Sequence, residues 1–293
     1  MKVMVIGANG QLGVDLVRSF GEFGWEVLAA THAEFDVRDT ASVSSAISAA
    51  KPNVVVNTAA FHKVEECESN PQLAFEVNAV GPMNLANTCR ENDATFIHIS
   101  TDYVFDGKRG EPYTETDTPS PLNVYGASKV AGEHLIAYST RRHFTIRTSG
   151  LYGVAGSSGK GGNFVETMLR KALAGEAVRV VADQVLSPTF TEDLALGIVE
   201  LASTSDYGLY HLSSDGQCSW FEFARAIFEI RGLKVDLTPV TTDQFPSPVR
   251  RPSYSVLSKA KIKSLGLTVV RPWRNALERY LQIKLQKATP ARH

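Results

Sequence analysis

The sequence predicts an α/β protein built on a doubly wound parallel sheet. Two observations support this fold class. In the first half of the chain, short continuous apolar runs alternate with amphipathic segments, which is typical of parallel strands that helices bury on both faces. A glycine-rich turn, VIGANGQLG, joins the first apolar run to the first amphipathic segment. Right-handed crossovers between parallel strands then place helices on both sides of the sheet.

The elements of the first half follow in order along the chain. Strands are predicted at residues 2–7, 25–30, 53–60, 95–100 and 143–149. The intervening helices are predicted at residues 11–24, 40–50, 71–92 and from 123 onward. In the first helix, Leu12, Leu16 and Phe20 recur at helical spacing and indicate the buried face.

After Ser149 the alternation is less regular, which predicts a second, smaller α/β domain. Residues 1–150, with a return segment near 183–212, are assigned to the larger domain, and residues 151–182 and 213–293 to the smaller one. The Gly/Ser-rich segment 153–162 is expected to be a mobile loop, and the tail 285–293 to be frayed. Further helices are predicted at these positions: residues 163–176, a helix capped near Thr191, residues 220–230, and a last helix after Pro272.

Composition excludes several classes of protein. The formal net charge is -1, so neither nucleic acid nor an acidic membrane surface is expected as the main partner. No apolar run approaches the roughly 20 residues that a membrane helix requires. Cys67, Cys89 and Cys218 form no CxxC pair, which indicates reduced thiols in a cytoplasmic protein. The seven histidines show no HxH or HxxxH spacing, and no metal site is predicted.

Gly7, Gly10 and Gly13 lie where the first strand meets the first helix. Glycine permits a tight turn and a close approach of the backbone to a pyrophosphate, while the helix N-terminus offers amide donors. The spacing GxxGxxG is one residue wider than GxGxxG, and a plain glycine turn is the alternative. Its place in the first βα unit favours a dinucleotide site.

The end of the second strand normally decides between the nicotinamide cofactors. A carboxylate there binds a free ribose 2′-hydroxyl, and an arginine binds a 2′-phosphate. This sequence has Thr31 and His32 at that position. The missing carboxylate favours NADPH, and use of NADH stays open.

Tyr125 and Lys129 are four residues apart and share one face of the predicted helix. A phenol ionises near pH 10, and a neighbouring ammonium lowers its pKa. A solvated Tyr–Lys pair is the alternative, because YxxxK alone is a weak signal. Thr101 follows the fourth strand, at the sheet edge where ligands of parallel sheets bind. The combination predicts an acid–base site that acts on a carbonyl group.

Several segments together resemble the extended short-chain dehydrogenase/reductase superfamily, and within it the dTDP-4-dehydrorhamnose reductase family. The segments that carry the resemblance are the glycine turn, NTAA, STDYVFDG, PLNVYGASK, IRTSGLYG, GGNFVETML, DQVLSPTFTEDLA and RRPSYSVLS. The resemblance implies a cofactor-binding Rossmann domain, a substrate-binding second domain and NADPH- or NADH-dependent reduction of the C4 ketone of a nucleotide-linked 4-keto-6-deoxy sugar. It also allows a homodimer.

The resemblance implies a role for individual residues. Thr101, Tyr125 and Lys129 form the catalytic triad, in which Tyr125 gives a proton to the sugar oxygen and Lys129 also binds the nicotinamide ribose. Asn78 is expected to be a structural helix asparagine. The remaining cofactor contacts are expected from Gly7, Asn9, Gly10, Gln11, Leu12, Gly13, Thr31, His32, Asp36, Val37, Ala59, Ala60 and Phe61.

The resemblance also implies four substrate-binding residues: Tyr103, Val104, Asn163 and Arg251. A helix cap is the alternative for Asn163 and an ion pair the alternative for Arg251. The family carries a tryptophan two residues before the tyrosine of RTSGLYG, where this chain has Gly150. An aromatic wall of the sugar pocket is therefore expected to be missing.

Two other functions stay open. One is an epimerase or dehydratase of the same superfamily, although dehydratases carry acidic residues after the triad threonine and this chain has only Asp102 before Tyr103. The other is a non-catalytic regulatory subunit of methionine adenosyltransferase, which resembles the same family.

Overall fold

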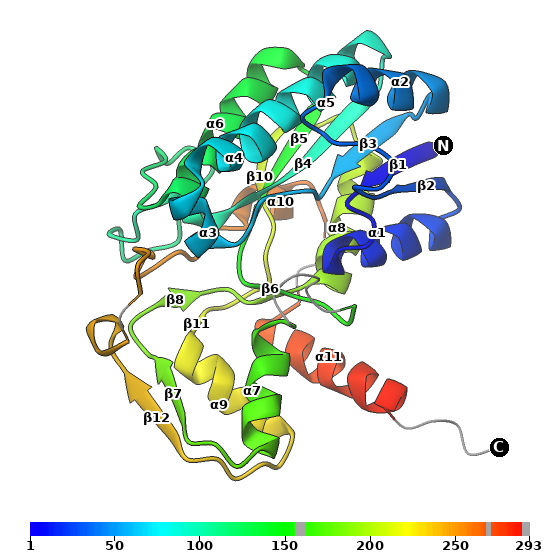
Figure 1. The fold of residues 1–293 in the computed structure, drawn as a ribbon. Coiled ribbons are helices and arrows are strands. Elements are labelled where there is room, and N and C mark those ends of the chain that lie inside the picture. The colour runs from blue at the N-terminus through cyan, green and yellow to red at the C-terminus, as the bar shows by residue number, and fades with distance from the viewer. Residues whose placement is uncertain (156–161, 246, 268–270, 289–293) are drawn as a thin grey trace, which may run out of the picture.

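A six-stranded parallel sheet forms the centre of the larger lobe in the computed structural model, which describes residues 1–155, 162–245, 247–267 and 271–288 (Figure 1). The strand order is β10-β5-β4-β3-β1-β2. The bounds are β1 (Lys2–Ile6), β2 (Glu26–Ala30), β3 (Val54–Asn57), β4 (Thr95–Thr101), β5 (His143–Thr148) and β10 (Gly208–His211). Every neighbouring pair is parallel. The predicted doubly wound parallel sheet is confirmed.

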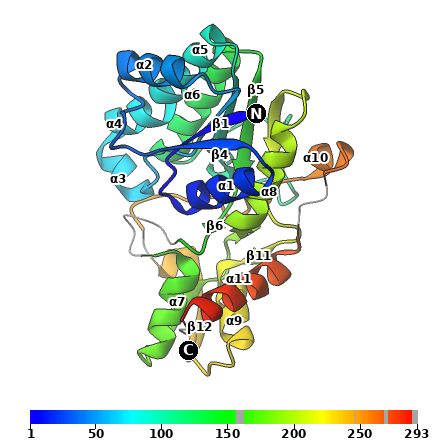
Figure 2. The same ribbon diagram turned by 90° about the vertical axis from the view of Figure 1, so that its right-hand side faces the viewer.

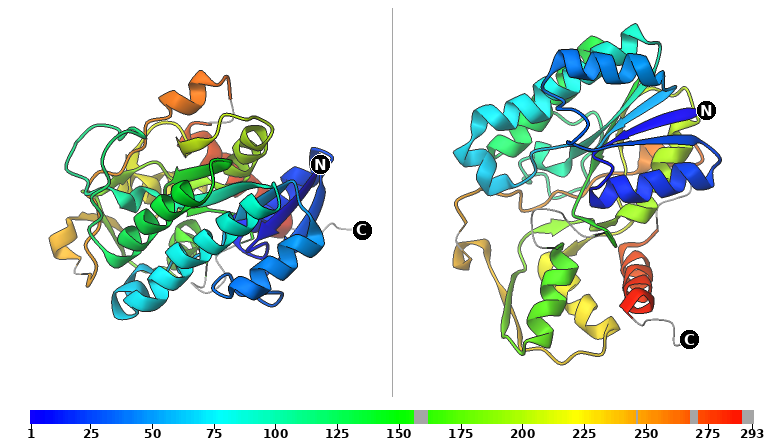
Figure 3. Two further views of the ribbon diagram at one scale, coloured as in Figure 1. Left: turned by 90° about the horizontal axis from the view of Figure 1, so that it is seen from above. Right: turned by 45° about the vertical axis from the view of Figure 1, so that its right-hand side comes forward.

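Helices cover both faces of this sheet, as Figure 2 and Figure 3 show. One face carries α2 (Thr40–Ala50), α5 (Gly81–Glu91) and α6 (Val124–Ser139), and the other carries α1 (Gln11–Glu22) and α8 (Thr191–Ala202). Strand side chains alternate between these layers. In β1, Val5 packs in the cluster with Ile198 of α8, and Met4 packs in the cluster with Leu85 of α5.

The helix predicted at residues 71–92 has an unexpected turn in its middle. It runs as α4 (Pro71–Phe75), a π-helical turn (Glu76–Val80) and then α5. π-Turns inside helices are rare and often accompany functional sites. Here the turn contains Asn78, whose amide accepts from Phe61 N at 2.9 Å and donates to Phe61 O at 2.9 Å. Asn78 therefore holds the segment that follows β3, in agreement with its expected structural role.

The smaller lobe lies below the parallel sheet in Figure 1 and contains short strands and helices of its own. The remaining elements of both lobes are α3 (Val64–Ser69), a 3-10 turn (Asp102–Val104), β6 (Leu151–Tyr152), α7 (Phe164–Leu173), β7 (Val178–Val181), β8 (Val185–Leu186), β9 (Thr189–Phe190), β11 (Cys218–Ser219), α9 (Trp220–Ile230), β12 (Leu237–Val240), a 3-10 turn (Thr242–Gln244), α10 (Ala260–Ser264) and α11 (Trp273–Ala288). The predicted helices at 163–176, 220–230 and after Pro272 are present.

The core of the smaller lobe is aromatic. The ring of Tyr152 lies 5.7 Å from that of Phe190, 5.4 Å from Phe223 and 5.2 Å from Tyr280. These residues come from β6, β9, α9 and α11, and all four are almost completely buried. The cluster joins segments that are far apart in the sequence, so it stabilises the lobe as one unit.

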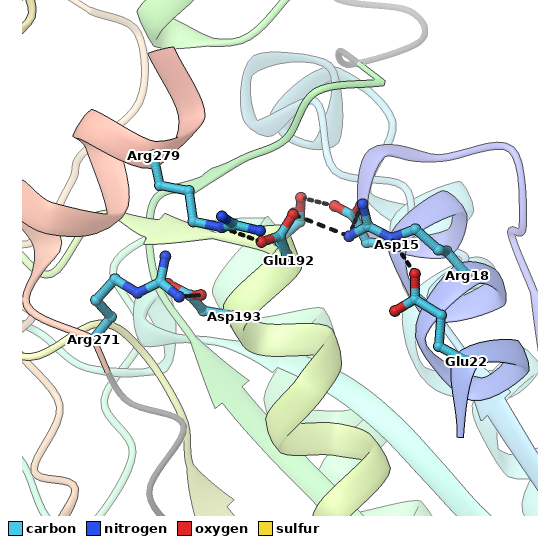
Figure 4. A network of polar contacts seen from close by, with 8 residues as sticks. Asp15, Arg18, Glu22, Glu192, Asp193, Arg271 and Arg279 are labelled. Carbon is cyan, nitrogen blue, oxygen red and sulfur yellow. Dashed lines mark hydrogen bonds and ion pairs between the residues drawn. The ribbon is translucent and has the colours of Figure 1, made fainter. Parts of the chain in front are cut away.

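A polar network with buried carboxylates connects α1, α8 and α11 across the two lobes (Figure 4). Glu192 of α8 accepts from Arg18 of α1 at 3.2 Å and from Arg279 of α11. Thr191 donates to Asp15 of α1. The predicted helix near Thr191 is present as α8, but no side chain caps it, and the Thr191 hydroxyl reaches α1 instead of the helix amides.

Two predictions fall partly outside the described residues. Most of the Gly/Ser-rich loop lies at 156–161 and the end of the tail at 289–293, both beyond what the structure describes. Among the described residues, the structure has no helix that is long and apolar enough to span a membrane.

Candidate active site

A cavity of about 530 Å³ opens at the carboxyl ends of β1, β3, β4 and β5, with the smaller lobe closing its other side. This edge is where open parallel sheets bind their ligands. The cavity brings together three groups of residues that are distant in the sequence. They are the glycine turn (Gly10, Gln11, Leu12), the triad with its neighbours (Ala60, Thr101, Tyr103, Tyr125, Lys129) and an apolar and polar wall (Gly150, Asn163, Phe164, Gln184, Leu186, Trp220).

The glycine turn has the geometry of a phosphate cradle. Gly7 has a φ of 76°, and a Cβ there would lie 2.6 Å from Thr58 Oγ1. At Gly13 a Cβ would lie 2.2 Å from Gly7 O, so α1 packs directly on the turn. Gly10 is the N-cap of α1 and brings no capping side chain, which leaves the first-turn amides for an anion. The residues fit a dinucleotide pyrophosphate.

A carboxylate does occupy the end of β2, contrary to the sequence analysis. Glu34 accepts from Thr31 N at 2.6 Å and from the Thr31 hydroxyl. The turn over residues 31–34 folds this side chain back to the strand end, and its hydrogen bonds to Thr31 lower the pKa of Glu34. The expectation that no carboxylate lies at this strand end is therefore wrong, and the position that the sequence analysis named, Thr31, is the one that Glu34 contacts.

Asp36 and Val37 follow this turn. Asp36 is engaged by Arg38, whose Nε lies 2.9 Å from Asp36 Oδ2, and this hydrogen bond lowers the Asp36 pKa to about 2. Val37 is buried against α5, where its carbonyl oxygen accepts from Asn84. His32 is exposed.

The other predicted cofactor residues surround the cradle without lining the cavity. Asn9 is exposed on the glycine turn, Ala59 packs at the edge of the core cluster, and Phe61 is held by Asn78. Their contact with a cofactor stays a prediction.

Tyr125 lies in the first turn of α6 and lines the cavity with Thr101. Asn123 caps this helix by accepting from Gly126 N at 2.8 Å, which fixes where α6 begins. Burial raises the Tyr125 pKa above its usual value, and the Thr101 side chain lowers it in part. The phenol is therefore held protonated, which suits a proton donor.

Lys129 extends from α6 to the sheet. Its Nζ donates to Ile99 O at 2.7 Å and lies 2.9 Å from His98 Nε2. Burial lowers the Lys129 pKa to about 7, and Glu133 one turn further along α6 acts in the opposite direction. In this arrangement the partners of Lys129 belong to β4, and its predicted influence on Tyr125 stays a prediction.

Asp102 is buried beside the triad. Its carboxylate accepts from Ser149 at 2.7 Å, from Ser255 at 2.5 Å and from Thr101 at 3.2 Å. These hydroxyls come from β4, from the end of β5 and from the segment at 255, so Asp102 joins the sheet to the chain that covers the cavity. Burial raises its pKa, and the three hydroxyls lower it in part.

The predicted substrate residues divide into two groups. Tyr103 lines the cavity, and its ring lies 6.0 Å from that of Tyr125. Asn163 also lines the cavity, but it caps α7 through Glu166 N at 3.1 Å, and its amide nitrogen donates to Gly153 O. Val104 is completely buried in a cluster with Phe105. Its side chain packs in that cluster and does not line the cavity.

Arg251 lies at the margin of the site. It pairs with Glu65 of α3 and donates to Ser247 Oγ at 2.6 Å. Its interaction with Tyr103 lowers the pKa of that phenol, which burial raises to about 12. Arg251 is thus in an ion pair, the alternative that the sequence analysis named, and its binding to a diphosphate stays a prediction.

The pocket has an aromatic wall despite Gly150. Gly150 has a φ of 55°, and a Cβ there would lie 2.7 Å from Leu186 and 3.7 Å from the Trp220 ring. Trp220 and Phe164 both line the cavity with their rings 4.6 Å apart. The expectation that an aromatic wall is missing is wrong, because Trp220 from α9 faces the space above Gly150.

Sequence reasoning missed Trp220, Phe164 and Glu34. The only local signal for Trp220 was its place after Ser219, the N-cap of a capping box with Glu222. Among the described residues, no group of three or more His, Cys, Asp or Glu side chains is arranged to hold a metal ion.

Comparison with known proteins agrees with this geometry. The family model described as "RmlD substrate binding domain" matches residues 1–285. The chain is 44% identical over 281 residues to the spore coat polysaccharide biosynthesis protein SpsK of Bacillus subtilis (strain 168), with 96% of this chain and 97% of that protein covered. It is 39% identical over 280 residues to the dTDP-4-dehydrorhamnose reductase of Mycolicibacterium smegmatis, with 94% and 84% covered.

A crystal structure of the dTDP-4-dehydrorhamnose reductase of Bacillus anthracis in complex with NADP has the same fold. The TM-score is 0.91 at 38% sequence identity, with 96% of this chain and 99% of that chain covered. The family match, these relatives and the Rossmann-type site agree, and the chain belongs to the dTDP-4-dehydrorhamnose reductase family.

Proposed function

We propose that this chain uses NADPH, or NADH, to reduce the C4 ketone of a nucleotide-linked 4-keto-6-deoxy sugar, converting dTDP-4-dehydro-L-rhamnose to dTDP-L-rhamnose. The observation that carries the proposal is the shared cavity, which Tyr125 and Thr101 line together with Gly10 of the phosphate cradle. Family membership supports the choice of substrate. The bound nicotinamide supplies the hydride, and the protein supplies the proton and the alignment.

Tyr125 is the proton donor in this proposal. A phenol is protonated at neutral pH, and burial disfavours its ionised form further, so Tyr125 has a proton to give to the oxygen at C4 as the ketone is reduced. Thr101 donates to Asp102 and accepts from Tyr103 N at 3.1 Å. To bond the substrate oxygen, Thr101 turns its hydrogen away from Asp102.

We assign the aromatic wall of Trp220 and Phe164 to the sugar. The polar side chains that line the cavity are assigned to the polar groups of the sugar nucleotide. Aromatic faces bind the apolar side of a deoxy sugar, while polar side chains fix its hydroxyls. Gln184 and Asn163 are the amides that line this side of the cavity. Arg251, at the margin, is assigned to the diphosphate, for which it leaves Glu65.

Reduction fits the site better than dehydration. A dehydratase needs a free carboxyl group next to the reacting sugar, and Asp102 is the acidic residue in that position. Its carboxylate already accepts from Thr101, Ser149 and Ser255, and only 3% of the residue is exposed. Asp102 therefore organises the site and is not available as an acid.

We propose a cytoplasmic location for the enzyme, since Cys67, Cys89 and Cys218 are buried thiols outside any disulfide. A homodimer is the assembly we propose, and sedimentation of the purified chain tests it.

The activity is tested by mixing the purified chain, NADPH and dTDP-4-dehydro-L-rhamnose. We expect one equivalent of NADPH to be oxidised for each sugar reduced, and the Tyr125→Phe variant to lose most turnover while binding NADPH normally. Sugar turnover without net NADPH oxidation would instead indicate an epimerase. A chain that binds a partner synthetase and reduces no keto sugar would instead indicate the regulatory role.

A further inference from the structure

His98 lies in the middle of β4 with no exposed surface. Its Cα is paired with that of Asn57 in β3 and that of Thr145 in β5. Parallel neighbours point to the same face of the sheet, and this face carries α6. The two ring nitrogens of His98 therefore lie between Asn57 on one side and Lys129 on the other.

Asn57, His98 and Lys129 form a row of side chains, and the donor and acceptor of each hydrogen bond in this row can be assigned. Ala59 N donates to Asn57 Oδ1 at 3.0 Å, which fixes the orientation of the Asn57 amide. Asn57 Nδ2 then faces His98 Nδ1 at 3.2 Å. An amide NH₂ group only donates, so Nδ1 of His98 is an acceptor and the ring proton of the neutral imidazole is on Nε2.

The consequence reaches the site through Lys129. Its Nζ lies 2.9 Å from His98 Nε2, and its other protein contact is the carbonyl oxygen of Ile99 at 2.7 Å. If Nε2 carries a hydrogen, Lys129 must accept it. A lysine accepts a hydrogen bond only as the neutral amine.

We propose that Asn57 and His98 are positioning residues that present an N–H group to Lys129 and hold it as a neutral amine in the ligand-free enzyme. The inference rests on the proposed function, in which Lys129 and Tyr125 belong to the same site. A neutral Lys129 does not promote ionisation of Tyr125, which lies one turn away on α6. The phenol stays protonated and ready for the reductive direction.

The charges around this row agree with the proposal. Burial lowers the Lys129 pKa to about 7, and burial with the Lys129 charge lowers that of His98. The carboxylate on the same helix face, Glu133, is bound bidentately to Arg147 of β5. Much of its charge is therefore compensated. The ionisable groups that act most strongly on the Tyr125 pKa are Asp102, Cys67 and Tyr103, and none of these three is a cation.

The tautomer of His98 tests the proposal in the ligand-free protein, without substrate. Ring-¹⁵N-labelled histidine and long-range ¹H–¹⁵N correlation distinguish a proton on Nε2 from one on Nδ1. His211 is the internal reference, because its Nδ1 faces Tyr113 O at 3.1 Å and so carries the proton. We expect the opposite tautomer in His98, and an Nδ1–H tautomer of His98 would overturn the proposal.

The Asn57→Asp variant exchanges donor and acceptor in the hydrogen bonds of this row. A carboxylate accepts from Nδ1–H, which moves the His98 proton and leaves Nε2 as an acceptor for a charged Lys129. We expect the Lys129 Cε and Nζ resonances to titrate at a higher pH in this variant. In the ligand-free protein the Tyr125 phenol should ionise at lower pH than in the wild type, because the new charge favours the phenolate.

Thr145→Val is the matched control. Thr145 flanks His98 on the side of β5 and its buried hydroxyl has no partner. We expect this variant to keep the His98 tautomer and the Lys129 titration of the wild type. If Asn57→Asp does not fold, the wild-type tautomer still decides the matter. Unchanged Lys129 titration in a folded Asn57→Asp protein would overturn the proposal. If the wild-type protein has the Nε2–H tautomer of His98 but no reductase activity, only the proposed function is overturned.

Discussion

The ion pair between Glu133 of α6 and Arg147 of β5 allows a direct test of how the helix that carries Tyr125 is fixed to the sheet. The contact is bidentate, with Arg147 Nε 2.9 Å from Glu133 Oε1 and Nη2 2.6 Å from Oε2. The side chains are 3% and 9% exposed, and Ser100 also donates to Glu133. Glu133→Gln keeps the size of the side chain and removes its charge.

The expected cost follows from what is left behind. Arg147 stays buried without its counter-charge, and breaking a buried pair costs about 3–5 kcal/mol. That is a large part of a total stability of about 5–15 kcal/mol. Urea unfolding should show a lower midpoint with an unchanged slope, because the surface exposed on unfolding stays the same.

A double-mutant cycle checks the reasoning. Glu133→Gln with Arg147→Met removes both charges, so the double variant should lose less stability than the sum of the single losses, by about 0.5–3 kcal/mol. Glu26→Gln is the control, since the Lys2–Glu26 pair is exposed and should cost less than about 1 kcal/mol. A cost below about 1 kcal/mol for Glu133→Gln, or strict additivity of the two losses, would refute the argument.

Three more predictions concern the site and the lobe contact. Trp220→Ala should raise the KM for the sugar nucleotide about tenfold, from a lost contact of about 1.4 kcal/mol, and leave NADPH affinity unchanged; an unchanged KM would exclude Trp220 from the sugar site. Glu34→Gln should shift preference toward NADPH on the order of tenfold, because a carboxylate repels a 2′-phosphate; an unchanged NADPH/NADH ratio of kcat/KM would contradict this. Burial raises the Asp193 pKa from 3.8 to about 6, so its contribution to stability is greatest at low pH and is lost as pH rises to about 6; Asp193→Asn should remove that slope in unfolding experiments.

The parts of the fold and site with local signals were predictable from the sequence. The strands around β1 and β4 are continuous apolar runs, and the glycine turn and the Tyr125–Lys129 spacing each lie within a few residues of the elements that place them. Parallel topology then brings the ends of β1 and β4 to one edge. For these features, periodicity and connection rules suffice.

The parts that depend on distant contacts were not predictable. Trp220 lies near Gly150 only because the smaller lobe brings the start of α9 to the segment that follows β5. Glu34 reaches the end of β2 through a turn whose hydrogen bonds to Thr31 no spacing rule indicates. His98 lies in an apolar run and gave no sign that its ring would meet Lys129. Each of these depends on a side-chain direction that only tertiary packing decides.

Isotope transfer tests the central claim most directly. The chain is incubated with dTDP-4-dehydro-L-rhamnose and NADPH that carries deuterium at the reactive position of the nicotinamide, and the product is examined by NMR. The account predicts deuterium at C4 of the sugar in proportion to the NADPH oxidised, and little transfer with Tyr125→Phe. A product without deuterium at C4, or equal transfer by Tyr125→Phe, would contradict it.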